Sequence, residues 1–340
     1  MDRRGRKPDN KHRVSDGAIG ARERGGSVGH WDFQRELAVW GPDAPPVAVP
    51  REEAERYCRR LATGHYENFP VVSALLPADL RQHFFNVYAY CRWSDDLGDE
   101  VGDPARSLEL LAWWRELLKE CYASRPRHPV FVALLPTIRR FDIPPEPLED
   151  LLSAFEQDQT VREYDTFENL LDYCRRSANP VGRLVLMLMG KGDGGHFAWS
   201  DSICTGLQLA NFWQDVSRDL DIGRVYLPRE DMVRFGVSQE DLALRRTTPA
   251  YRELLRFQVE RTRPYLAPWR TQGRSEMRQF STRQQMEVEL FARGGLEVLR
   301  KIEAIGYDTL RTRPVVTKAD GARLLAGCVW RGLKRRFVRG

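Results

Sequence analysis

The chain has 340 residues, of which 42% are hydrophobic and 30% charged, and its formal net charge is +5. That length and composition are typical of an ordinary globular protein with a substantial core. The most apolar run, residues 183–190 (RLVLMLMG), is far too short to span a bilayer, so no transmembrane segment is expected. The six cysteines show no CxxC pair and no paired-histidine spacing, which argues against a zinc site and a disulfide scaffold and favours a cytoplasmic protein.

The basic residues in excess lie mainly at the two ends of the chain. Residues 1–45 are predicted to form a disordered, basic and proline-rich extension, and they lack the apolar segment of a secretory signal. The last stretch, residues 331–340 (RGLKRRFVRG), is also basic. Such ends either attract anionic lipid or are simply solvated; we favour solvation, and peripheral contact with the inner face of the membrane stays open. Aromatic residues do not alternate with the basic ones, so nucleic acid is not an expected partner.

Residues 46–340 are predicted to form one all-α domain, because almost every segment has helical periodicity and strand signals are nearly absent. A first helix over residues 50–64 starts with proline and acidic residues and ends in glycine. Prolines mark many of the later breaks. Further helices are predicted over residues 78–97, 105–124, 128–141, 146–158, 166–190, 197–221, 249–271, 275–305 and 318–337.

Two of these predicted helices carry an acidic stripe. In the first, one narrow face presents Tyr88, Arg92, Asp95 and Asp99. In the second, steps of four residues align Asn211, Asp215 and Asp219. Like charges one turn apart repel each other, yet two such carboxylates can both give oxygens to Mg²⁺, which binds through carboxylates, waters and substrate phosphates. We therefore predict that the stripes face each other and hold Mg²⁺ and a diphosphate, an arrangement suited to diphosphate loss.

A solvated surface is the alternative explanation for either stripe taken alone. A single pair of aspartates one turn apart is common on exposed helices, and Arg92 could simply pair with Asp95 or Asp96. Two stripes, each flanked by aromatic and apolar residues, favour a binding site.

The stretches YAYCRWSDDLGDE (88–100) and LQLANFWQDVSRDLDIGRVYLP (207–228) resemble the two aspartate-rich motifs of the squalene and phytoene synthases. The resemblance runs from about His65 to residues 294–314 (GGLEVLRKIEAIGYDTLRTRP). It implies an α-helical bundle around a central cavity. It also implies that Mg²⁺ and diphosphate bind to Asp95, Asp99, Asp215 and Asp219. Residues implied to contact the substrate are Tyr88, Arg92, Asn211, Gln214 and, in a flap near the site entrance, Phe69.

Three departures from the family pattern bear on the reaction. Residues 173–184 read YCRRSANPVGRL, with Arg176 where condensing members commonly have a tyrosine. Gln214 precedes the second motif where many members have arginine, and residues 65–70 (HYENFP) replace a segment containing Ser and Lys. This combination is similar to the hydroxysqualene synthases of the bacterial hopanoid route.

That branch of the family acts on presqualene diphosphate, which another family member makes. The resemblance implies that loss of diphosphate leaves a cyclopropylcarbinyl cation, which rearranges and is captured by water to give hydroxysqualene. No hydride donor is then required. Gln214 and Asn211 are polar candidates for positioning the water, and the alternative is that both only support the second motif.

Parts of the sequence also admit other interpretations. Residues 190–195 (GKGDGG) fit the GxGxxG pattern of dinucleotide-binding proteins, but the segment before them has helical periodicity, so a connection between helices is expected. A synthase that condenses two prenyl diphosphates stays open, whereas a helical scaffold without activity is disfavoured by the four motif aspartates. Trp93, Phe212 and Trp213 could steady a carbocation, but we expect them to be core residues.

Overall fold

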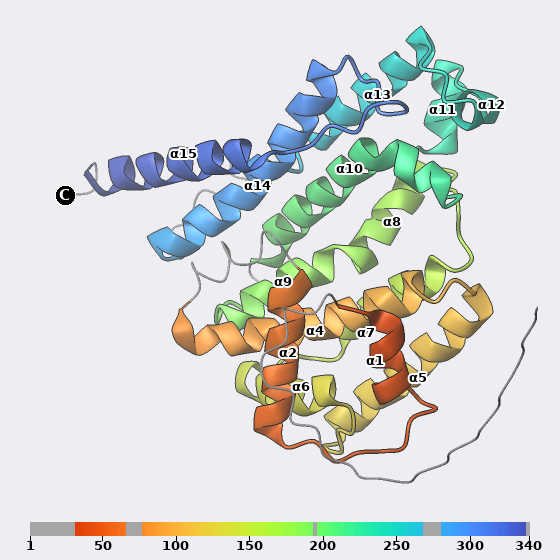
Figure 1. Cartoon of the computed structure of the whole chain (residues 1–340). Helices are drawn as coiled ribbons and strands as arrows, with labels where there is room; N and C mark the ends of the chain where they lie inside the picture. The colour runs from red at the N-terminus through yellow and green to blue at the C-terminus, as the bar shows by residue number, and fades with distance from the viewer. Residues whose placement is uncertain (1–30, 66–76, 193–195, 268–279, 338–340) are drawn as a thin grey trace, which may run out of the picture. The chain divides into compact units, whose positions relative to one another are not determined.

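The computed structural model describes residues 31–65, 77–192, 196–267 and 280–337, and these form an all-α fold (Figure 1). Within these ranges the only β-type pairing is an isolated bridge between Glu163 and Val225. The predicted fold class is therefore confirmed. The helices are α1 (Phe33–Trp40), α2 (Arg51–His65), α4 (Ala78–Asp99), α5 (Pro104–Tyr122), α6 (Pro129–Phe141), α7 (Glu146–Gln157), α8 (Phe167–Ser177), α9 (Asn179–Leu188), α10 (Phe197–Asp221), α11 (Arg229–Phe235), α12 (Gln239–Ala243), α13 (Pro249–Thr262), α14 (Thr282–Ala304) and α15 (Lys318–Phe337).

Helices α10 and α15 have the bounds that periodicity predicts. The single helix predicted over residues 166–190 is instead two helices, α8 and α9. Pro180 occupies the first turn of α9 and cannot continue a helix from α8, because proline lacks the backbone N–H that the preceding turn needs. The short helices α11 and α12 were not predicted.

Helix α1 lies within the range expected to be disordered. Asp32 caps it by accepting a hydrogen bond from the backbone N–H of Arg35 at 3.2 Å. Phe33 is 5% exposed and packs in the core, on the ring of Trp93 at a centroid distance of 5.5 Å. The expected domain boundary at residue 45 is therefore wrong for the segment from residue 31 onward, while residues 1–30 lie outside the described ranges.

Buried side chains form two main clusters, one around each acidic stripe. The first packs α2, α4, α5 and α6 together, and its centre is the stacked pair Trp93 and Trp114, 5.2 Å apart and both fully buried. The second packs α8, α10 and α13 together and includes Phe212 and Trp213. Each stripe-bearing helix is thus anchored by apolar side chains on the faces that do not carry the stripe.

Helix α10 lies between α8 and α14 (Figure 1). Two glycines leave room for Leu266, which follows α13 and packs against both α10 and α14. A Cβ atom added to Gly206 on α10 would lie 2.8 Å from Leu266, and one added to Gly295 on α14 would also lie 2.8 Å from Leu266. Both distances are shorter than van der Waals contact allows, so these positions fix how α10, and with it the second stripe, sits in the bundle.

Candidate functional site

An arginine joins the ends of the two stripe-bearing helices. Arg224 lies just past the C-terminus of α10, and its Nη2 donates a hydrogen bond of 2.9 Å to Oδ1 of Asp99 at the C-terminus of α4. The Arg224 side chain is 11% exposed. The two helix ends, far apart in the sequence, therefore meet at this ion pair.

On α4, the pair Arg92 and Asp96 supports the first stripe. Arg92 Nε donates to Oδ2 of the fully buried Asp96 at 3.1 Å, and that oxygen also accepts a hydrogen bond of 2.9 Å from Trp31 Nε1. Arg92 Nη1 lies 3.4 Å from Asp95 Oδ2. Arg92 thus pairs with both Asp95 and Asp96, the two partners expected for it if the stripe were a solvated surface.

The electrostatics of the first stripe favour a cation. Loss of hydration, together with the neighbouring charge of Asp99, raises the pKa of Asp95 to about 7. The Asp95 side chain nevertheless keeps 42% of its surface exposed, so it is open to a ligand. A bound cation would favour the ionised form of this carboxyl group.

On α10, the second stripe is paired with an arginine from the other end of the chain. Arg313, on the connection between α14 and α15, binds both carboxylate oxygens of Asp215, with Nη2 3.2 Å from Oδ2. Burial and the charge of Asp215 raise the pKa of Asp219 to about 7. Oδ2 of Asp219 is buried and has no hydrogen-bond partner among the described residues. This oxygen is an acceptor that a metal ion or a donor could satisfy.

No group of three or more His, Cys, Asp or Glu side chains in the described ranges is close enough to hold a metal ion by itself. Mg²⁺ does not need such a group, because it is typically bound by one or two carboxylates together with waters and substrate phosphates. The pairs Asp95 with Asp99 and Asp215 with Asp219, and the free acceptor on Asp219, fit ions of this kind.

The remaining residues predicted to contact the substrate differ in exposure. Gln214 is 8% exposed and its Nε2 donates a hydrogen bond of 2.5 Å to the carbonyl oxygen of Pro314, so it holds the α14–α15 connection against α10. Asn211 is exposed on α10. Tyr88 is partly buried against the first cluster. Phe69 lies outside the described residues.

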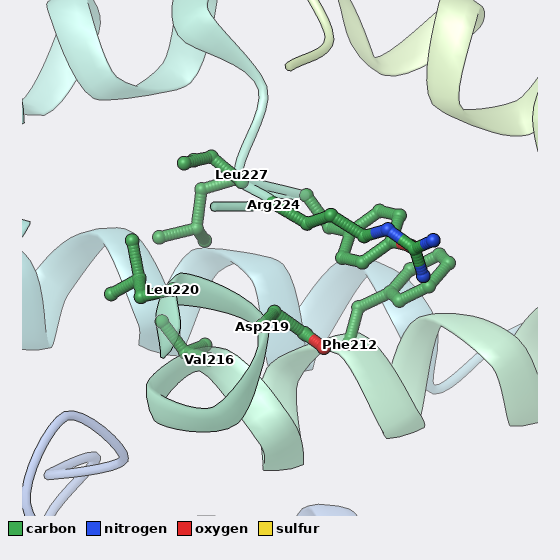
Figure 2. A pocket seen from close by; sticks show the side chains of 8 residues that line it. Phe212, Val216, Asp219, Leu220, Arg224 and Leu227 are labelled. Carbon is green, nitrogen blue, oxygen red and sulfur yellow. The ribbon is translucent and has the colours of Figure 1, made fainter. Parts of the chain in front are cut away.

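A small pocket, which no sequence pattern indicates, borders the second stripe. Figure 2 shows Asp219 and Arg224 extending to the same side of this pocket, beside Phe212. Aliphatic and aromatic side chains form the rest of its wall: Val216, Leu220, Val225, Tyr226 and Leu227. Asp219 and Arg224 are the charged residues of this wall.

Asp158 belongs to the same neighbourhood. It follows α7, is 5% exposed, and its Oδ2 accepts a hydrogen bond of 2.8 Å from the hydroxyl of Tyr173. Burial raises the pKa of Asp158 to about 6, and the Arg224 charge opposes that rise. The stretches that resemble the family include Arg224 and Arg313, although neither lies on a predicted stripe. No sequence pattern indicates a role for Asp158.

The aromatic residues beside the motifs are core residues, as predicted. Trp93 and Trp213 are fully buried, and their indole N–H groups bond to the hydroxyl oxygens of Tyr57 and Thr262, each at 2.9 Å. Phe212 is 3% exposed and stacks on Tyr226 with 3.8 Å between ring centroids. Only Phe212 also borders the pocket.

The glycine-rich stretch is not preceded by a strand. Helix α9 ends at Leu188, and Gly190 follows it with a φ of +72°, which is a helix-ending conformation. The predicted connection between helices is confirmed for residues 189–192. None of the helices in the described ranges has the length and hydropathy needed to cross a membrane.

The comparisons with known proteins agree with this architecture. Residues 62–320 match the squalene/phytoene synthase family. Phytoene synthase of Arthrospira platensis is 31% identical over 237 residues, covering 65% of this chain and 77% of that protein. Hydroxysqualene synthase of Rhodopseudomonas palustris is 35% identical over 207 residues, covering 60% and 69%.

Solved structures show the same fold. Squalene synthase HpnC from Alicyclobacillus acidocaldarius superposes with a TM-score of 0.71 at 41% identity, covering 77% of this chain and 97% of that one. A dehydrosqualene synthase superposes with a TM-score of 0.73 at 24% identity, covering 84% and 98%. Since the family match spans most of the described fold and includes both stripes, this chain belongs to the squalene/phytoene synthase family, whose members process prenyl diphosphates.

Proposed function

We propose that this protein is a hydroxysqualene synthase. Presqualene diphosphate loses diphosphate, the resulting cyclopropylcarbinyl cation rearranges, and water captures the cation to give hydroxysqualene. Mg²⁺, when bound by Asp95, Asp99, Asp215 and Asp219, supplies positive charge that stabilises the departing diphosphate. An enzyme that makes presqualene diphosphate must supply the substrate.

The observation that carries this proposal is Arg176, at the position where condensing members commonly have a tyrosine. Its Nη2 donates to Gln157 Oε1 at 2.6 Å and to Asp172 Oδ2 at 2.8 Å. These bonds hold the guanidinium in a structural network. Because the residue is arginine, the position has no phenol for a condensing step. The similarity to the hydroxysqualene synthase of Rhodopseudomonas palustris supports the same proposal.

The protein's own groups prepare the site for an anionic leaving group. Arg92 and Arg224 lie at the first stripe, and Arg313 lies at the second. Each is held by a carboxylate, so the cations stay at the site without a bound anion. The apolar clusters beneath α4 and α10 keep bulk water from the interior, which suits a reaction through a carbocation.

Condensation of two prenyl diphosphates is the second candidate. The observation in its favour is the similarity to phytoene synthases, of which the one from Arthrospira platensis is 31% identical. It would retain the same four aspartates and the same metal, so the substrate distinguishes the two functions.

The test gives purified protein Mg²⁺ without NADPH and either presqualene diphosphate or farnesyl diphosphate, followed by extraction and product analysis. We expect hydroxysqualene from the first substrate and no consumption of the second. Asp215→Asn should abolish the product, whereas Asp43→Asn, at an exposed carboxylate of the α1–α2 connection, should not. Consumption of farnesyl diphosphate would make the protein a condensing synthase.

A further inference from the structure

A tryptophan from outside the family match contacts the helix that carries the first stripe. The match begins at residue 62, whereas Trp31 lies just before α1. Its indole Nε1 donates a hydrogen bond of 2.9 Å to Oδ2 of Asp96, a fully buried carboxylate on α4. Asp96 directly follows Asp95 in the chain, so this bond reaches the helix turn that carries the stripe.

Ring packing and a second hydrogen bond fix the segment to which Trp31 belongs. The rings of Trp31 and Phe33 lie 6.3 and 5.5 Å from the ring of Trp93, measured between centroids. Gln34 Nε2 donates a hydrogen bond of 2.7 Å to the backbone carbonyl oxygen of Glu100, at the C-terminus of α4. This segment is therefore held against the end of α4 that carries the first stripe.

The carboxylate of Asp96 sets the direction of Arg92. Arg92 Nε donates a hydrogen bond of 3.1 Å to Asp96 Oδ2, and Arg92 Nη2 forms an ion pair with Asp96 Oδ1. A guanidinium group is planar and rigid, so two nitrogens held by one carboxylate fix the direction of the third. That third nitrogen, Nη1, lies 3.4 Å from Oδ2 of Asp95, in the stripe. The orientation of Asp96 therefore decides where Arg92 presents its charge.

Trp31 in turn restricts the carboxylate of Asp96. Oδ2 of Asp96 accepts hydrogen bonds from two donors, the indole of Trp31 and the guanidinium of Arg92. Rotation of the carboxylate would break the bond to Trp31, and at a fully buried site bulk water does not replace a lost bond. Without that indole, Arg92 would be the one partner left to Asp96 among the described residues, and the pair could turn together.

We propose that Trp31 is a positioning residue for the diphosphate group of the substrate, acting through Asp96 on Arg92. The side chains of Arg92 and Asp95 are 24% and 42% exposed, so both are open to a ligand. A charge that is already oriented costs no reorganisation when the anion binds beside it. The inference rests on the diphosphate site of the proposed function and not on which product the enzyme forms.

The test compares the binding of inorganic diphosphate at saturating Mg²⁺ to the wild type and to Trp31→Phe, by titration calorimetry at a temperature where both are folded. We expect the Kd of Trp31→Phe to be about tenfold higher, as for other residues that orient a binding group without touching the ligand. Trp40→Phe is the matched control, because the ring of Trp40 packs on Tyr57 and His128, at 6.1 and 6.2 Å. It should lower the stability and leave the Kd unchanged.

A double-mutant cycle distinguishes positioning from a general loss of packing. If Trp31 acts through Asp96, the combined variant Trp31→Phe/Asp96→Asn should bind diphosphate about as tightly as Asp96→Asn alone, because both substitutions break the same chain of contacts. If the two effects on the Kd simply multiply, Trp31 acts on the site by another route and the proposal is wrong.

The outcomes separate this inference from the function on which it rests. If the wild type binds no diphosphate with Mg²⁺, the proposed diphosphate site fails and the inference fails with it. If the wild type binds diphosphate and Trp31→Phe binds it equally, the inference alone is overturned, whichever product is formed.

A crystal structure of the wild type with Mg²⁺ and diphosphate gives a check that does not depend on a variant folding. Arg92 Nη1 within about 3 Å of a diphosphate oxygen, with the bond from Trp31 to Asp96 retained, supports the proposal. An Arg92 side chain that makes no contact with the diphosphate refutes it.

Discussion

The pair of Arg313 and Asp215 makes the most specific prediction about metal binding. Both carboxylate oxygens are bound to the guanidinium, and the two side chains are 31% and 13% exposed. A hydrogen bond to a charged partner contributes about 1.5–3 kcal/mol when buried. Partial exposure reduces this to roughly 1–2 kcal/mol. A metal ion that binds Asp215 must displace Arg313 or share the carboxylate with it.

Arg313→Gln should therefore act in opposite directions on two measurements. Without metal, the protein should lose about 1–2 kcal/mol of stability and its Tm should fall by about 2–6 °C, because the carboxylate loses its partner. Mg²⁺ affinity without substrate should rise about 5- to 30-fold, because the ion no longer competes with the guanidinium. Calorimetry in EDTA measures the first effect, and titration calorimetry with Mg²⁺ measures the second.

Arg183→Gln is the matched control for this experiment. Arg183 binds both oxygens of Asp201, at 3.0 and 2.6 Å, and these side chains are 29% and 19% exposed. It should lose similar stability, with no change in Mg²⁺ affinity. If Arg313→Gln bound Mg²⁺ no more tightly than the wild type, Asp215 would not be a metal ligand or its arginine would not compete with the ion, and the reasoning would be wrong.

Two further predictions concern a core residue and a titrating carboxyl group. Trp93→Phe should lower the free energy of unfolding by about 2–3 kcal/mol, because it removes volume and the hydrogen bond to Tyr57 from a fully buried site. The products of the enzyme should stay unchanged. Altered products would give Trp93 a role in the reaction. The pKa of Asp219 is raised from 3.8 to about 7, so its contribution to the stability of the metal-free protein is present below about pH 4 and is lost as the pH rises through 7. Mg²⁺ affinity should rise over the same pH window. Denaturant titrations at a series of pH values should show that the stability of Asp219→Asn depends less on pH than that of the wild type. An equal dependence on pH would refute the raised pKa of Asp219.

The sequence alone predicted the local features of this protein well. The 3.6-residue period placed α10 over residues 197–221 and put Asp215 and Asp219 on one face, because both are properties of a single helix. Proline marked where helices begin, although Pro180 also divided one predicted helix into two. The apolar faces of the same helices predicted the core positions of Trp93 and Trp213.

The tertiary structure decided which charges meet. Arg224 and Asp99 are 125 residues apart in the sequence, and Arg313 and Asp215 are 98 apart, so no helical period relates them. Asp158 lies at the end of a helix with no acidic stripe, and only the packing of α7 against α8 brings it to Tyr173. Periodicity determines the face of a helix on which a residue lies, whereas the partner of that face depends on how the helices pack. The stripes were therefore predictable from the sequence, and the arginines and the buried carboxylate that complete the candidate site were not.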